Sequence, residues 1–90
     1  MLDVRYSSRF KKDFKLCTKR GYKMELLKQA VDMLRASERL SRQFLDHALS
    51  GELTNYRECN LEPDWLLIYR QDEGELLLYR TGTHSDLFGK

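Results

Sequence analysis

The chain contains two histidines, His47 and His84, and both fall outside the apolar stripes of the expected helices and strands. An imidazole has an unperturbed pKa of about 6.5, so it can take up and release a proton near neutral pH. We therefore treat both as candidates for general acid–base chemistry. The alternative for each is a solvated loop histidine or one that makes a local hydrogen bond. Asp46 stands directly before His47, where it could orient the ring or raise its pKa.

Glu58, Asn60 and Asp64 form a second group of polar residues, along and just after one expected strand. Glu58 and Asn60 are two residues apart, so their side chains point from the same face of that strand. A carboxylate can accept a proton there, whereas asparagine only forms hydrogen bonds at neutral pH. Asp64 ends a Glu-Pro-Asp turn, where it either contributes to a catalytic site or accepts hydrogen bonds from backbone N–H groups of the turn. Arg57 has the opposite parity to Glu58, which favours a structural role.

Metal or cofactor binding is not expected from these residues. Two histidines and two isolated cysteines show no ligand spacing, and the carboxylates lack the order of a calcium-binding loop. Cys17 and Cys59 are interpreted as small apolar core residues in a reducing compartment.

The first half of the chain predicts one strand and two helices. Residues 2–6 alternate apolar and polar, which indicates a short strand, and Ser7 or Ser8 can cap the helix that follows. The first helix carries an apolar stripe and ends near Gly21; the stripe consists of Phe10, Phe14 and Cys17. The second helix is predicted over residues 23–36, with a stripe of Leu27, Ala30, Val31 and Leu34. Together they predict a helical hairpin that needs a sheet to cover.

The second half predicts a loop and three strands. Residues 37–53 are expected to be loop, and strands are expected over residues 54–61, 64–71 and 75–81. The middle strand is apolar on both faces, which predicts a central position. We expect one α+β domain over residues 1–90, of order β-α-α-β-β-β. Its helical hairpin packs on one face of a small antiparallel sheet, and the other face stays partly open.

Charge is divided unequally along the chain. Residues 1–45 hold 12 Lys and Arg against 5 Asp and Glu, and residues 46–90 hold 4 against 9. A basic half predicts a polyanionic partner such as RNA, although solvated helix faces would give the same count. The basic residues of the first helix lie opposite its apolar stripe: Lys12, Lys15 and Lys19. The apolar runs are too short to span a bilayer, and the start lacks a signal-peptide pattern, so we expect a cytoplasmic protein without a membrane partner.

Three stretches of the sequence resemble a known family when they are taken in order. They are residues 46–51 (DHALSG), residues 56–69 (YRECNLEPDWLLIY) and residues 80–88 (RTGTHSDLF). This pattern, together with the strand and helical hairpin before it, resembles the YafQ-like toxins of the RelE/ParE superfamily. The resemblance covers nearly the whole chain, and it implies a RelE-like fold.

The resemblance also implies a function and roles for individual residues. Family members act as metal-independent ribonucleases that cut mRNA in the ribosomal A site, and a cognate antitoxin, here DinJ-like, silences them. His84 is then the strongest catalytic candidate, as general acid or proton shuttle, and His47 is the second histidine. Asp64 and Glu58 match acidic site positions, and Arg80 matches a basic residue that would hold phosphate. Phe88 matches an aromatic residue that packs near the site or stacks on a base.

Asn60 departs from the family pattern, which has histidine at this position. Losing a full acid or base lowers a rate by about 10²–10⁴-fold. We expect a natural variant that uses Glu58 or Asp64 as base; a weakened toxin and an inactivating change are the alternatives. Two further readings are a silent binder of the ribosome or antitoxin, and a ParE-like gyrase inhibitor. The gyrase inhibitor would need neither histidine.

Overall fold

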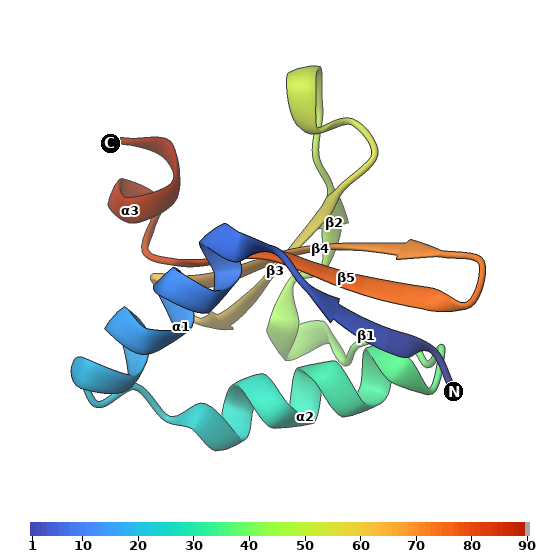
Figure 1. The fold of residues 1–90 in the computed structure, drawn as a ribbon, viewed down its shortest axis with the longest axis horizontal. Coiled ribbons are helices and arrows are strands. Elements are labelled where there is room, and N and C mark those ends of the chain that lie inside the picture. Colours follow the sequence, from blue (N-terminus) through green and yellow to red (C-terminus); the bar gives the residue numbers. More distant parts are fainter. Residues whose placement is uncertain (90) are drawn as a thin grey trace.

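The computed structural model describes residues 1–89, in which two long helices cover one face of a five-stranded sheet (Figure 1). The strands lie in the order β1-β5-β4-β3-β2. The strands are β1 (Asp3–Tyr6), β2 (His47–Ala48), β3 (Arg57–Glu62), β4 (Trp65–Asp72) and β5 (Glu75–Gly82). The helices are α1 (Ser8–Lys19), α2 (Met24–Arg35) and α3 (His84–Phe88), with 3₁₀ turns η1 (Arg42–Phe44) and η2 (Gly51–Leu53).

The α+β class and the helical hairpin on one face are confirmed, but the sheet is mixed rather than wholly antiparallel. Strands β2 to β5 pair antiparallel, whereas β1 lies parallel to β5, with Val4 opposite Leu76. A parallel pair needs a long crossover, and the helices and the other strands of the chain supply it here. The alternation in residues 2–6 predicts a strand, but it carries no information on the partner or its direction.

The two helices begin and end close to the predicted positions. The Ser7 hydroxyl accepts a hydrogen bond from the Phe10 amide at 2.9 Å and so caps α1. Gly21 follows α1 at a φ of +78°, where glycine carries no steric cost. α2 is one residue shorter at each end than predicted.

Alternate residues of β3, β4 and β5 face the helices and form the core with them. This core includes Cys59, Trp65, Leu67, Tyr69 and Leu78, packed against Phe10, Cys17, Leu27 and Leu34. Both cysteines are free and buried in it, as predicted. The middle strand β4 is central and buried on both faces, because Leu66 and Ile68, on the side away from the helices, are also buried.

The predicted loop at residues 37–53 has more structure than expected. It contains η1, whose Phe44 is buried, the two-residue strand β2, and η2. A two-residue strand has no periodicity that a sequence could show, so β2 was missed. The short helix α3 was also missed, although its capping box of Thr83 and Asp86 is a recognisable start signal.

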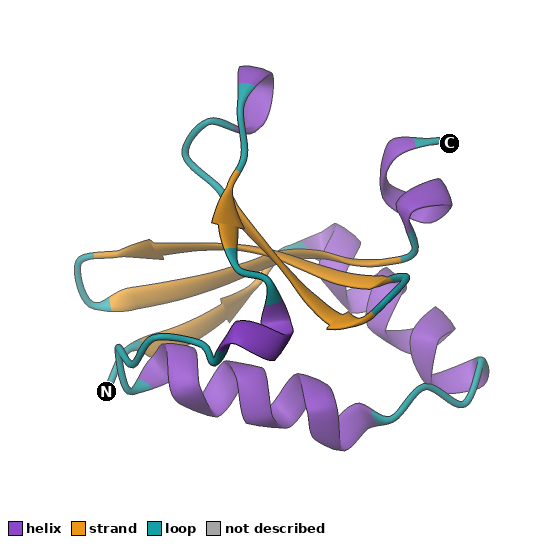
Figure 2. Ribbon diagram, turned by 180° about the vertical axis from the view of Figure 1, so that it is seen from behind, coloured by secondary structure: helices purple, strands orange, loops and turns teal. Residues whose placement is uncertain are grey.

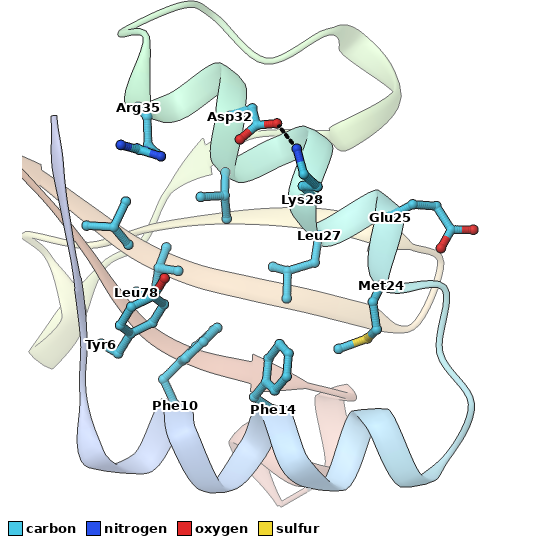
Figure 3. A pocket seen from close by; sticks show the side chains of 12 residues that line it. Tyr6, Phe10, Phe14, Met24, Glu25, Leu27, Lys28, Asp32, Arg35 and Leu78 are labelled. Atoms are coloured by element: carbon cyan, nitrogen blue, oxygen red, sulfur yellow. Dashed lines mark hydrogen bonds and ion pairs between the residues drawn. The ribbon is translucent and has the colours of Figure 1, made fainter. Parts of the chain in front are cut away.

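The helices and β1 leave an apolar groove between them (Figure 3). Its volume is about 470 Å³. Phe10 and Phe14 of α1 and Leu27 of α2 point into it, and the Lys28–Asp32 ion pair lies at its rim. Phe14, placed in the buried stripe by its spacing, is 39% exposed here because it lines this open groove. Among the described residues, no helix is long and apolar enough to cross a membrane.

Candidate active site

The face of the sheet away from α1 and α2 is flanked by two raised segments. Figures 1 and 2 show α3 at one end of this face and the η2 segment, between β2 and β3, at the other. Residues that are register partners on neighbouring strands form rows across this face, and several of them are polar. Asn60 and Gly82 both pair with Leu66 and therefore lie about 10 Å apart across β4. Glu58 lies in the next row, opposite Ile68.

His84 and Asp64 form a hydrogen-bonded pair where β5 ends and β4 begins. The Asp64 Oδ1 atom accepts hydrogen bonds from the His84 backbone N–H at 3.0 Å and from the ring Nδ1 at 2.7 Å. Together these bonds hold the pKa of Asp64 below its usual range, with the backbone N–H as the largest cause. A carboxylate only accepts, so Nδ1 carries the proton and the ring presents Nε2 for proton transfer.

The helix that carries His84 is fixed at its start by Asp86. The Asp86 carboxylate accepts from the Thr83 backbone N–H at 2.9 Å, and the Thr83 hydroxyl accepts from the Asp86 amide at 3.0 Å. Arg20, at the end of α1, donates to both oxygens of Asp86 at 2.6 and 3.1 Å. The Arg20 hydrogen bonds are the largest cause that lowers the pKa of Asp86. Gly82 allows this approach, because a Cβ at that position would lie 2.9 Å from Asp86 Oδ2.

His47 and Glu58 form a second pair, on neighbouring strands β2 and β3. The two residues are register partners, and His47 Nε2 lies 3.3 Å from Glu58 Oε1. His47 Nδ1 lies 2.8 Å from the Leu45 carbonyl, which fixes Nδ1 as a donor. Glu58 is 6% exposed, whereas the His47 side chain is half exposed. The carboxylate is thus buried, whereas the histidine in contact with it faces solvent.

Asp46 does not orient His47, so that prediction is wrong. Adjacent residues of a strand-like segment point to opposite faces, and the Asp46 carboxylate turns to the helix side. There it accepts from the Tyr69 hydroxyl at 2.6 Å and from Arg57 at 3.3 Å. The hydrogen bonds to Asp46 raise the pKa of Arg57. The structural role expected of Arg57 from its parity is confirmed.

Asn60 lies on the same face as Glu58, as the spacing predicts. Its amide nitrogen is 3.5 Å from the Pro63 carbonyl, a long hydrogen bond within the turn that leads to Asp64. Asn60 therefore stands between the two histidine–carboxylate pairs and touches the turn that carries one of them. Its amide can hydrogen-bond a phosphate or hydroxyl there, but it cannot transfer a proton.

Arg80 is part of an ion pair rather than a free cation. Its Nε and one terminal nitrogen donate to the Asp13 carboxylate of α1 at 2.7 and 3.1 Å. Asp13 also accepts from the Thr81 backbone N–H at 3.1 Å, so it joins α1 to β5. A phosphate would compete with Asp13 for this guanidinium, and the role of Arg80 as a phosphate clamp stays a prediction. Phe88 lies four residues after His84, on the same side of α3, and is 40% exposed.

The basic residues predicted to bind RNA lie away from this face. Lys12, Lys15 and Lys19 are exposed on α1, which packs on the opposite side of the sheet from Glu58. Sequence reasoning did not single out Asp13, Arg20 or Asp86. The ion pairs of Asp13 and Arg20 join residues more than 60 positions apart, for which the sequence carries no spacing signal, whereas the capping box with Thr83 could have identified Asp86.

Within residues 1–89, no group of three or more His, Cys, Asp and Glu side chains is arranged to share a metal ion. The candidate site consists of the His84–Asp64 pair, the His47–Glu58 pair and the amide of Asn60. Such a set can accept one proton and donate another on either side of a bound group.

Comparisons with known proteins agree with this fold. A family model described as a bacterial toxin of type II toxin–antitoxin systems, YafQ, matches residues 2–89. The mRNA interferase toxin YafQ of Escherichia coli K12 is 41% identical over 88 residues, which cover 97% of this chain and 96% of the relative.

Solved structures give the same result. The E. coli DinJ–YafQ complex matches with a TM-score of 0.91 at 40% identity, over 99% of this chain and 100% of that chain. A copper-bound mutant toxin from Helicobacter pylori matches with a TM-score of 0.94 at 40% identity, over 98% and 100% of the two chains. The resemblance seen in the three sequence motifs is confirmed: the chain belongs to the YafQ family of bacterial toxins of type II toxin–antitoxin systems.

Proposed function

We propose that this chain is a metal-independent endoribonuclease that cuts mRNA in the ribosomal A site and so blocks translation. The observation that carries the proposal is the pair of histidine–carboxylate contacts on one open face, His84–Asp64 and His47–Glu58. Its E. coli relative is named an mRNA interferase, which supports the same reading.

The reaction uses the 2′-hydroxyl of one nucleotide as nucleophile. The Glu58–His47 pair takes the 2′ proton while the 2′ oxygen attacks the adjacent phosphorus. The bond from phosphorus to the 5′ oxygen then breaks, and His84 Nε2 gives its proton to that oxygen. The products are a 2′,3′-cyclic phosphate and a 5′-hydroxyl. Asp64 accepts the hydrogen bond from Nδ1 and so holds the His84 ring with Nε2 free to face the substrate.

Asn60 has a binding role in this scheme. Standing between the two pairs, its amide donates a hydrogen bond to a phosphate oxygen as negative charge develops there. Glu58 supplies the base that the family histidine would otherwise provide. Asn60 also gives the reason to retain a second candidate function, a catalytically silent toxin that binds ribosome or antitoxin without cutting. The family relationship leaves no observation in favour of the gyrase inhibitor.

The partners follow from the same proposal. The α1 lysines bind ribosomal RNA by charge, which makes the affinity sensitive to salt. A DinJ-like antitoxin binds the toxin and silences it, and the complex of the E. coli relative supports this partner. Because its substrate is mRNA on ribosomes, the protein acts in the cytoplasm.

The proposal is tested by single-turnover cleavage of a message held on stalled ribosomes, in a chain purified with chelator. A single 2′-deoxy nucleotide at the mapped cut should abolish cleavage there. Glu58→Gln should lower the rate by about 10²–10⁴-fold. Glu52→Gln, an exposed carboxylate on η2, is the matched control and should leave the rate unchanged. Cleavage of the deoxy substrate, or loss of activity after removal of metal, would contradict the mechanism.

A further inference from the structure

Two tyrosines and an arginine form a layered group on the same open face, beside the Glu58–His47 pair. The rings of Tyr56 and Tyr79 lie 4.7 Å apart between centroids, tilted by 30°. The Arg70 guanidinium carbon lies 5.2 Å from the centre of the Tyr56 ring. Its terminal nitrogen also donates to the Tyr56 hydroxyl at 3.4 Å. All three side chains are half-buried, and the two tyrosines lie outside the core that the helices cover.

An irregularity in β5 places Tyr79 on this face. The β4–β5 register shifts between Ile68 and Tyr69, so that Ile68 pairs with Arg80 and Tyr69 with Leu78. Tyr79 is therefore an extra residue in the ladder. The bulge lets neighbours diverge: Arg80 reaches Asp13 on α1, while the Tyr79 ring meets Tyr56 on the opposite side of the sheet. Bulges of this kind re-aim side chains and are frequent beside active sites.

The group lies within reach of a substrate held by the catalytic residues. Tyr56 is two residues before Glu58 on the same side of the chain, a step of about 6.7 Å along an extended strand. His84 and Phe88 stand at the other end of the face, on α3. The catalytic pairs thus have an aromatic residue at each end, Phe88 on one side and the tyrosine pair on the other.

We propose that Tyr79, supported by Tyr56 and Arg70, is a stacking site for a nucleobase of single-stranded RNA. The base belongs to the nucleotide on the side of the scissile phosphate away from Phe88. An aromatic ring backed by a second ring and a guanidinium offers a flat, sequence-tolerant surface, and every base has a face to lay on it. Arg70 Nε also donates to the Asp72 carboxylate at 2.9 Å, so Arg70 supports the Tyr56 ring and is not needed to bind phosphate. The inference rests on the proposed ribonuclease function and adds a substrate subsite to it.

The test measures RNA binding in a His84→Ala chain, which separates the subsite from cleavage. The probe is a short single-stranded RNA that spans the cut and is labelled for fluorescence anisotropy. A second set of probes has the same sequence, with one nucleotide at a time made abasic. Tyr79→Leu should weaken binding of the intact RNA by about 5- to 20-fold, since it removes the stacking surface but keeps an apolar side chain. Tyr79→Phe keeps the ring and should bind within about twofold of the parent.

The abasic series identifies the base that stacks. At one position on the side away from Phe88, the abasic RNA should bind the parent as weakly as it binds Tyr79→Leu. Tyr6→Leu is the matched control, because Tyr6 is an exposed tyrosine on β1 that lines the groove on the helix side. It should leave the affinity unchanged.

Three results would overturn the subsite: equal binding by Tyr79→Leu and the parent, a loss with Tyr79→Leu that persists at every abasic position, or no RNA binding by the parent. Cleavage of mRNA on ribosomes by the unmodified chain tests the proposed function separately. If cleavage is present while the tyrosine variants bind normally, only the subsite fails. If the subsite is found without cleavage, the chain is a silent RNA binder.

Discussion

Replacing Gly82 with alanine should displace α3, the helix that carries the proposed general acid His84, without changing any residue of the two histidine–carboxylate pairs. Gly82 has a φ of +155°, which L side chains rarely adopt, and its added Cβ would lie 2.9 Å from Asp86 Oδ2 and 3.0 Å from Asp86 Cβ. A non-glycine residue in such a conformation costs about 1–3 kcal/mol. For a domain of this size that loss lowers the melting temperature by about 4–24 °C.

The same change should slow cleavage, because α3 must move away from the new methyl group and carry His84 with it. A misplacement of about 1 Å can cost about 10²-fold in rate, so we expect a decrease of about 10- to 100-fold with little change in ribosome binding. Gly74→Ala is the matched control. Gly74 also has a positive φ, +79°, but its Cβ would meet no atom within 4 Å, and it lies in the β4–β5 turn.

Thermal unfolding and single-turnover cleavage together decide this prediction. Gly74→Ala should lose stability but retain the cleavage rate, whereas Gly82→Ala should lose both. In an Asp86→Ala chain, which lacks the clashing carboxylate, Gly82→Ala should lower the melting temperature by less than it does in the unmodified chain. A normal cleavage rate in Gly82→Ala, or cleavage that is slowed equally in Gly74→Ala, would show that the clash with Asp86 does not control the position of His84.

Three further predictions concern the Arg20–Asp86 ion pair, the two buried cysteines and the lysines of α1. Because Arg20 lowers the pKa of Asp86 in the folded chain, the ion pair stabilises the fold at neutral pH, and this contribution is lost as the pH falls below about 4. Urea unfolding at several pH values should therefore show a smaller decrease in the free energy of unfolding at acid pH in Asp86→Asn than in the unmodified chain. Burial raises the pKa of the Cys59 thiol to about 12 and also raises that of Cys17, so iodoacetamide at pH 8 should modify neither in the folded chain and both in urea; rapid modification of the folded chain would contradict their placement. Reversing the charge of the α1 lysines should weaken ribosome binding more than cleavage of a minimal RNA, and equal losses would refute the separation of the two surfaces; the variant combines Lys12→Glu, Lys15→Glu and Lys19→Glu.

The sequence predicted most of the fold because its signals are local and periodic. The apolar stripes of α1 and α2 and the two-sided apolar run of β4 each identify an element from spacing alone. The parallel pairing of β1 with β5 could not be predicted, since it joins residues about 70 positions apart. The same limit applied to β2, which is too short to show any period.

For the site, spacing and resemblance identified which residues to examine but not how they pair. Parity placed Glu58 and Asn60 on one face, and the structure agrees. Adjacency in the chain suggested Asp46 as a partner for His47, but the actual partner is Glu58, contributed by the neighbouring strand. Sequence neighbours point to opposite faces of a strand, so the residue adjacent in the chain was the wrong choice.

The catalytic role of the face that carries His84 is tested most directly by primer extension on a defined message held on stalled ribosomes. The unmodified chain is compared with His84→Ala. We expect cuts in the A site by the unmodified chain that are lost in the variant, while both proteins still bind the ribosome. Binding without cuts from either protein would contradict it and would make the chain a silent binder; cuts of equal strength from both would remove His84 from the mechanism.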